Sequence, residues 1–475
     1  MSYLRRHITD QISITPLAMF RVIFGAMMLL SIVRFAIKGW IYDLYVLPTY
    51  HFTYFGFDWV KPLSELGMYG LFTVMALSAA GIMLGWYYRL SSILFFLSFT
   101  YVELIDKTNY LNHYYFVSLV SFLMIFLPAH RYFSLDVLRK PDLETSIVPA
   151  WTINIIKFQL GLVYFYAGLA KLNTAWLFDA MPLKIWLPAN SGLPVLGTLF
   201  NYEWTAYAFS WFGAIYDLSI VFFLLYGATR LWAYGAVLAF HLMTAALFQI
   251  GMFPYIMILS TLVFFSHDFH QKIIESISTA LRSFFRFESG KRWENPKTLR
   301  TPKPMLFFLS IYVVFQLAFP FRYLAYPGDL FWTEQGYRFS WRVMLMEKAG
   351  YTVFNVSDTC SCFPLSVSGY TVFNVSDTES GKQEQVMNYR YLTENQEKMM
   401  STQPDMILQF AHFLEGIYLE KGFVDPEITV ESYVTLNGKR SRLFIDPSVD
   451  LTKEIDSFAH KSWVLPLNQP ITASR

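Results

Sequence analysis

The chain has 475 residues, of which 55% are hydrophobic, 19% aromatic and only 15% charged, and its formal net charge is +2. This composition is typical of a polytopic membrane protein and excludes a soluble enzyme. The near-neutral charge and the absence of a long basic tract give no reason to expect nucleic acid as a partner.

Apolar runs predict about nine transmembrane helices in a polytopic α-helical protein. They lie near residues 18–37, 68–86, 89–105, 114–129, 152–174, 206–226, 231–249, 252–267 and 305–323. If Arg5 and Arg6 are cytoplasmic, this count also puts Arg89, Arg230 and the basic 268–304 connection inside, as the positive-inside rule requires. Everything after the ninth helix is then outside the cytoplasm.

The composition changes near residue 326, which predicts a transmembrane domain over 1–325 and an extracytoplasmic α+β domain over 326–475. In the second domain, residues 404–421 have helical apolar spacing. Residues 428–438 and 441–446 alternate as strands around Asn437-Gly438, a short-range hairpin signal.

A duplicated segment interrupts this domain. GYTVFNVSDT occurs unchanged at 350–359 and at 369–378, and the only two cysteines, Cys360 and Cys362, lie between the copies. Two cysteines so close together are too few for a disulfide framework or a zinc site, so we interpret them as incidental. We expect 350–378 to contain an insert, with one copy of the repeat looped out.

Lys171 lies inside an apolar stretch, 151–176, that is predicted to be a helix with its polar groups on one face. Lys157, Gly161, Tyr164, Gly168 and Lys171 are spaced by four, three, four and three residues, which makes one stripe. A lysine at membrane depth usually faces protein or a water-filled cavity, which indicates a functional site. The alternative is that Lys171 only extends to the lipid headgroups.

Other ionisable groups lie on the same side of the membrane in this topology. The 103–115 connection, with Glu103 and His113, shares a leaflet with Lys171 and with the C-terminal domain. A desolvated lysine can act as a base, which arginine cannot. His241 and Asp217 lie within apolar helices; His241 is either a hydrogen-bonded helix contact or a catalyst, and Asp217 could pair with Lys157 or Arg230.

No motif of a soluble enzyme is present, so any chemistry should use an organic cosubstrate that dissolves in the bilayer. With these residues in view, the chain resembles the vitamin K-dependent γ-glutamyl carboxylase family and its bacterial relatives with an HTTM domain. The matching blocks, which occur in family order, are DKTNYLNHYYF (106–116), HRYFSLDVL (130–138), VYFYAGLAKLNTAW (163–176), AFHLMTAALFQIGMFPY (239–255), WTEQGYRFSWRVML (332–345), TLNGKRSRLFIDPSVD (435–450) and SWVLPL (462–467).

The resemblance implies a specific reaction. A lysine deprotonates reduced vitamin K, oxygen adds, and the resulting strong base removes the γ-proton of a protein glutamate. Carbon dioxide then captures the carbanion to give γ-carboxyglutamate, and the quinone leaves as its epoxide. The resemblance therefore implies a lyase with epoxidase activity that uses reduced vitamin K or menaquinone, O2 and CO2, with no metal.

The resemblance also implies roles for individual residues. The catalytic lysine corresponds to Lys171 and the assisting histidine to His113. Residues that bind or support the quinone are expected to be Asn112, Tyr164 and His241. The glutamate-binding region corresponds to 332–345, with Trp332, Tyr337 and Trp341. Tyr337 and Trp341 could instead be aromatic residues of the membrane interface.

The chain departs from the animal members of the family. Those have two adjacent lysines where this chain has Ala170-Lys171, paired cysteines that join the two parts, and a long C-terminal extension. These differences suggest a homologue from a bacterial inner membrane, acting on a glutamate-containing protein or peptide. The rival hypothesis is a membrane transporter or quinone-binding protein without carboxylase activity, but no internal repeat of the kind transporters show is evident.

Overall fold

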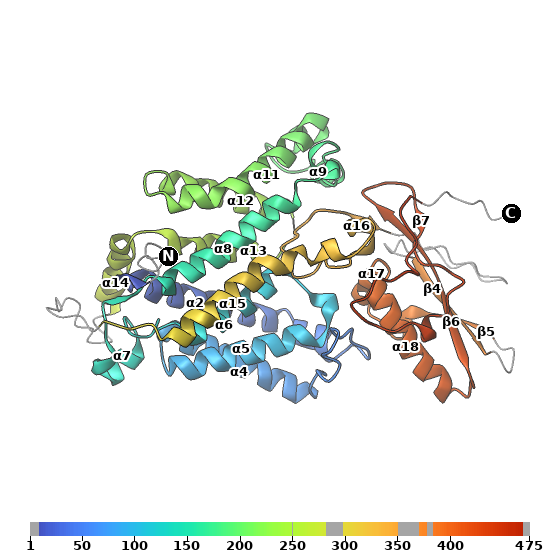
Figure 1. The fold of residues 1–475 in the computed structure, drawn as a ribbon, viewed down its shortest axis with the longest axis horizontal. Helices are drawn as coiled ribbons and strands as arrows, with labels where there is room; N and C mark the ends of the chain where they lie inside the picture. The colour runs from blue at the N-terminus through green and yellow to red at the C-terminus, as the bar shows by residue number, and fades with distance from the viewer. Residues whose placement is uncertain (1–8, 249, 282–297, 350–369, 378–382, 469–475) are drawn as a thin grey trace.

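The computed structural model describes residues 9–248, 250–281, 298–349, 370–377 and 383–468. Long helices run side by side, and a sheet with two further helices closes one end of them (Figure 1). The helices before residue 326 are α2 (Thr15–Ile37), α3 (Trp40–Tyr45), α4 (Glu65–Leu84), α5 (Tyr88–Ile105), α6 (Asn112–Phe126), α7 (Leu135–Arg139), α8 (Trp151–Ala170), α9 (Thr174–Leu177), α10 (Leu183–Ala189), α11 (Glu203–Leu225), α12 (Arg230–Leu247), α13 (Phe253–Thr261), α14 (His267–Leu281) and α15 (Lys303–Ala318).

The chain is a helical membrane protein. Within the described residues, seven helices are long and apolar enough to cross a bilayer, namely α2, α4, α5, α8, α11, α12 and α15 with its 3-10 extension to Ala325. The other two predicted spans also fold as apolar helices, but α6 and the α13 segment Phe253–Phe264 are shorter. The count of nine crossings therefore stays a prediction.

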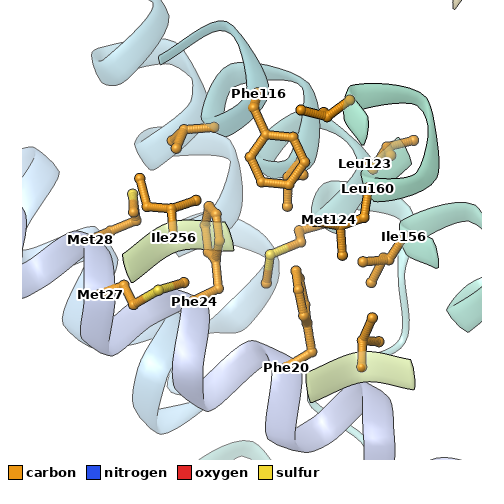
Figure 2. Packing of buried hydrophobic residues seen from close by; sticks show 14 of the residues in the cluster. Phe20, Phe24, Met27, Met28, Phe116, Leu123, Met124, Ile156, Leu160 and Ile256 are labelled. Carbon is orange, nitrogen blue, oxygen red and sulfur yellow. The ribbon is translucent and has the colours of Figure 1, made fainter. Parts of the chain in front are cut away.

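Helix α2 packs against α4, α8, α13 and α14. Its Phe20 and Phe24 point toward Met124 of α6 and Ile256 of α13 (Figure 2). Gly25 lets α4 approach closely, since a Cβ there would lie 2.4 Å from the backbone nitrogen of Met83. This packing buries apolar surface on helices that are distant in sequence and makes one continuous core.

The C-terminal region is α+β, as predicted. It contains α16 (Leu330–Thr333), β3 (Lys348–Ala349), β4 (Tyr370–Asp377), β5 (Gln383–Val386), α17 (Glu394–Met400), α18 (Pro404–Glu420), β6 (Pro426–Leu436) and β7 (Arg442–Leu443). Strand β6 pairs antiparallel with β3, β4 and β7, and β4 also pairs with β5. The predicted turn is present, with Asn437 and Gly438 both in the left-handed region at φ 52° and 69°. A separate small pair joins β1 (Gln11–Ser13) to β2 (Ile147–Pro149).

The register of this sheet explains how the duplication is accommodated. Thr435 of β6 faces Ala349 and Tyr433 faces Tyr370, so an uninterrupted strand would place residue 351 opposite Tyr433. The residue found there comes nineteen positions later, which is also the spacing of the two copies. Strands β3 and β4 therefore pair with β6 as two parts of one strand would, in the same register.

Both strands lie on one edge of β6. Backbone groups along a strand alternate between its two edges. Ser432 of β6 accepts a hydrogen bond from Phe444 beyond β7, whereas Asn437, five residues further, donates to Glu347 just before β3. Strand β3 thus lies opposite β7, on the edge that β4 occupies. The second copy of the repeat forms β4, and the first copy and both cysteines lie outside the described residues.

Removing one repeat should leave the fold intact. Deleting residues 360–378 leaves a single copy after Ala349, which can continue β3 directly into β4 without changing the pairing with β6. We expect the free energy of unfolding to change by less than about 1 kcal/mol, because long insertions and their removal cost little loop entropy. Thermal unfolding of the purified protein measures this change.

A deletion of equal length, residues 379–397, removes β5 and the start of α17 and provides a destabilised control. A loss of more than about 2 kcal/mol on deleting 360–378, the size of a core lesion, would show that the insert is packed into the domain.

Candidate active site

Helix α8 presents its polar stripe to α11. A Cβ on Gly168 would lie 2.7 Å from the backbone nitrogen of Leu218, and one on Gly161 would lie 3.3 Å from the side chain of Val221. The glycines therefore let the two helices pack closely. This contact brings Lys171, which follows the last residue of α8, beside Asp217 in the middle of α11.

Lys171 is buried and paired. Only 6% of the residue is exposed, and its Nζ donates to Asp217 Oδ2 at 2.6 Å and to the carbonyl of Ala167 at 3.3 Å. The ammonium also lies 5.4 Å from the centre of the Trp176 ring. The alternative in which Lys171 extends to the headgroups is therefore wrong, because a side chain so placed would be exposed.

The partners suggested for Asp217 are also wrong. Lys157 lies over the ring of Phe264 at 5.8 Å, and Arg230 donates to the carbonyls of Leu224 and Leu225. Both lie away from Asp217 because the close contact of α8 and α11 leaves Lys171 nearest to its carboxylate.

A cavity of about 100 Å³, here the lysine cavity, opens beside this pair and has an almost entirely apolar wall. Its lining residues include Lys171, Trp176, Leu183, Trp186, Phe209, Phe212, Asp217, Phe240, His241, Leu247, Phe248, Phe253, Val343 and Met344. His241 Nε2 and the hydroxyl of Tyr164 are 3.0 Å apart, and His241 Nδ1 is buried without a hydrogen-bond partner among the described residues. Apolar walls with a few oriented polar groups are typical of small-molecule sites.

A second cavity, of about 520 Å³, lies next to the first and is here named the cationic cavity. Its lining includes Arg34, Lys107, Asn112, His113, Glu334, Tyr337, Arg338, Arg342 and Lys348. The two cavities share the wall residues Ile250, Phe253, Val343 and Met344. The ring of Phe253 lies 5.9 Å from that of His113 and 5.7 Å from that of His241, centre to centre, so it contacts a histidine of each cavity.

The structure divides the predicted site residues among three places. Lys171 and His241 line the lysine cavity, with Tyr164 behind His241. Asn112, His113 and Tyr337 line the cationic cavity.

Trp332 and Trp341 lie behind the cavity walls. Trp332 donates from Nε1 to the carbonyl of Leu465 and packs against Phe444, and Trp341 stacks on Tyr115 at 4.8 Å. Both indoles are fully buried, which places them as supports of the site and not as part of its lining.

The segment that carries Tyr337 and Trp341 has an unusual backbone. Glu334, Phe339, Trp341 and Met344 have φ values of 55°, 58°, 59° and 53°, in the left-handed region that residues with a side chain rarely adopt. Several such residues within eleven positions cost free energy and persist where the surroundings hold them. Strain of this kind concentrates at ligand sites, and this segment contributes to both cavities.

An ion pair joins the membrane part to the C-terminal region at this segment, and two further pairs lie beside it. Asp405 of α18 binds Lys107, which follows α5, at 2.8 Å, and Arg338 at 2.7 Å. Burial alone would raise the pKa of the Asp405 carboxyl, but Arg338 and Lys107 hold that pKa well below its usual range. Lys348 of β3 binds Glu334 at 2.8 Å; burial lowers the pKa of this lysine, and Glu334 opposes the shift.

Sequence reasoning missed Asp217 as the partner of Lys171, and it missed Arg342 and Phe253. A carboxylate inside the apolar run AIYDLSIVFF was a usable signal for Asp217, since such a residue needs a buried partner. Arg342 directly follows Trp341 in a block already singled out. Phe253 carries no signal of its own, because apolar residues surround it in sequence.

The fold and the site define an integral membrane protein that holds a buried charged pair in an apolar cavity. A cationic cavity adjoins it, with walls from both the helices and the α+β region. Residues 10–269 match the family model described as HTTM domain, and residues 301–362 and 365–470 match the one described as vitamin K-dependent gamma-carboxylase, lumenal domain. The chain belongs to the vitamin K-dependent gamma-carboxylase family. No solved structure gives a significant match.

The ion pairs of Asp405 should dominate the stability of the junction. Asp405→Asn leaves Lys107 and Arg338 without their carboxylate, and we expect a loss of about 2 kcal/mol at pH 7, since removing one partner of a buried pair is costly and Asp405 is partly exposed. A carboxyl group whose pKa is lowered by folding stabilises the folded state above its unfolded pKa of about 3.9. This contribution is lost as the pH falls from that value through the lower pKa of the folded state. The difference between variant and wild type should therefore persist from pH 8 to 5 and shrink below about pH 4.

Thermal unfolding across this pH range measures the difference. Asp268→Asn, which removes an exposed partner of His267, is the control and should change stability by less than about 0.5 kcal/mol. Equal effects of the two substitutions would mean that the Asp405 pairs contribute nothing specific to the junction.

Proposed function

We propose that this protein couples oxygenation of a reduced quinone to carboxylation of glutamate side chains in a protein or peptide. The observation that carries the proposal is Lys171, buried at 2.6 Å from Asp217 in an apolar cavity that adjoins a cationic one. The apolar cavity suits a quinone ring and the cationic cavity suits a carboxylate. When bound, the reduced quinone with O2 supplies the strong base that the γ-proton of glutamate requires, and CO2 supplies the new carboxyl group.

In this proposal Lys171 is the base that takes the hydroquinone proton. To do so, the amine must first give up its own proton, and the Asp217 carboxylate is within hydrogen-bond distance to accept it. The Ala167 carbonyl then helps to orient the amine.

The histidines have separate roles in this scheme. His241, held by Tyr164 through Nε2, presents the rest of its ring to the lysine cavity and orients the quinone. His113 lies on the other side of the Phe253 ring, in the cationic cavity, and from there it assists the proton transfer from the hydroquinone. Asn112 fixes this arrangement, since its Nδ2 donates to the carbonyl of Arg342 at 2.8 Å.

Lys171→Ala should lower formation of both the epoxide and the carboxylated glutamate by at least about 100-fold, the usual scale for loss of a catalytic base. Lys171→Arg should fail as well, because a guanidinium stays protonated. His113→Ala should impair the same step less completely. The measurement is an assay of purified membranes with reduced vitamin K, bicarbonate and a glutamate peptide, scored separately for the two products.

Lys157→Ala is the matched control, because Lys157 lies on the same stripe of α8 but outside the cavity, over Phe264. It should retain wild-type turnover. Partial rescue of Lys171→Ala by small amines would identify the missing group as a base. Near-normal epoxidation by Lys171→Arg would instead show that position 171 needs only a positive charge.

We further propose that the C-terminal region lies outside the cytoplasm of a bacterial cell. The basic 268–304 connection supports this orientation. With Cys360 and Cys362 removed, a cysteine at 420 should react with a membrane-impermeant thiol reagent in intact cells, and one at 290 should react only after lysis. Equal labelling of both in intact cells would contradict the orientation.

A further inference from the structure

The cations of the cationic cavity differ in whether the protein neutralises them. Lys107 and Arg338 share the carboxylate of Asp405, and Lys348 binds Glu334. A buried charge is costly unless it has a partner, so these three are satisfied without a ligand. Arg34 is half-buried and lies 4.9 Å from the centre of the Trp40 ring, where water can still screen it.

Arg342 is the exception. Only 8% of the residue is exposed, and it forms no ion pair with any described residue. Its Nε is buried without a hydrogen-bond partner in the described part of the chain, and its guanidinium carbon lies 4.3 Å from the centre of the Tyr323 ring. Tyr323 stacks on the guanidinium and also hydrogen-bonds to it, which fixes its plane, while Nε and the remaining N–H donors have no other partner among the described residues.

The position of Arg342 gives these donors access to a ligand. The residue lines the cationic cavity, and it also lines a neighbouring cavity of about 280 Å³ that includes Tyr323 and Asp329. The carboxylate of Asp329 is engaged elsewhere, because its Oδ1 accepts the backbone N–H groups of Phe331 and Trp332. The hydrogen bond from Asn112 to the Arg342 carbonyl, together with the strained backbone at Trp341 and Met344, holds the residue in place.

We propose that Arg342 binds the γ-carboxylate of the substrate glutamate and makes the protein select glutamate over glutamine. The inference rests on the proposed function for the identity of the substrate. A planar guanidinium with free N–H groups donates two parallel hydrogen bonds to a carboxylate, a geometry that an amide cannot match. The bound carboxylate completes the charge balance of the cavity, and its neighbouring γ-carbon then lies beside the wall of Phe253, Val343 and Met344 shared with the lysine cavity.

Peptide binding tests this role without requiring turnover. The probes are a fluorescently labelled pentapeptide with one glutamate and the same peptide with glutamine, titrated with the detergent-purified protein and read by anisotropy. We expect the wild type to bind the glutamate peptide at least about tenfold more tightly, on the scale of one charge-assisted contact. Arg342→Gln should bring this ratio close to one, and Arg342→Lys should leave an intermediate ratio.

Arg230→Gln is the matched control, an identical substitution at a half-buried arginine that lines neither cavity and donates to backbone carbonyls, and it should keep the wild-type ratio. A wild-type ratio in Arg342→Gln would overturn the inference, as would a wild type that does not distinguish the peptides. If Arg342→Gln does not fold, as judged by its thermal transition, Arg342→Lys decides, since an unchanged ratio there would exclude a role for the guanidinium geometry. If Arg342→Gln loses the preference for the glutamate peptide but the wild type makes no epoxide, the binding site is supported and the proposed reaction is refuted.

Discussion

The site depends on one constraint, which is that a charge held away from water must have a partner. Asp405 lies between Lys107 and Arg338, Glu334 holds Lys348, and Asp217 holds Lys171. Lys107 and Asp405 come from the two parts of the chain, so their pair fixes how the helices and the C-terminal region meet, whereas Glu334 and Lys348 pair within the C-terminal region. These ion pairs also hold the segment from Glu334 to Met344 in a backbone conformation that it would not adopt alone.

Hydrogen bonds from neutral side chains add to the ion pairs of Asp405 at the junction between the two parts. Gln396 of α17 donates to Asp106 and to the carbonyl of Tyr50, and Gln409 of α18 donates to the carbonyl of Thr53. Each such hydrogen bond is worth about 1 kcal/mol net, so several together can hold a rigid contact without a covalent link. The rigidity matters because cavity walls come from both parts.

The sequence was informative wherever a feature depends on nearby residues. Apolar length located every predicted span as a helix, and apolar spacing with the Asn437-Gly438 pair located α18 and the turn between β6 and β7. It was uninformative about contacts between distant segments. Lys171 and Asp217 are 46 positions apart, and Asn112 and Arg342 are 230 apart, so helix packing decides these pairs and no local pattern encodes them. The burial of Trp341 against Tyr115 was missed for the same reason, since an interfacial and a core tryptophan have the same local sequence.

Stability alone does not explain the pair of Lys171 and Asp217. Replacing a buried ion pair by apolar side chains of similar size is often neutral or stabilising by about 1–4 kcal/mol, and the wall around this pair is already apolar. The pair is also not needed to bring α8 and α11 together, because Gly161 and Gly168 already allow the close approach. Asp405 is different, since it joins two parts that share few other charges. A buried pair that the packing of these two helices does not require is the arrangement that the proposed proton transfer between Lys171 and Asp217 needs.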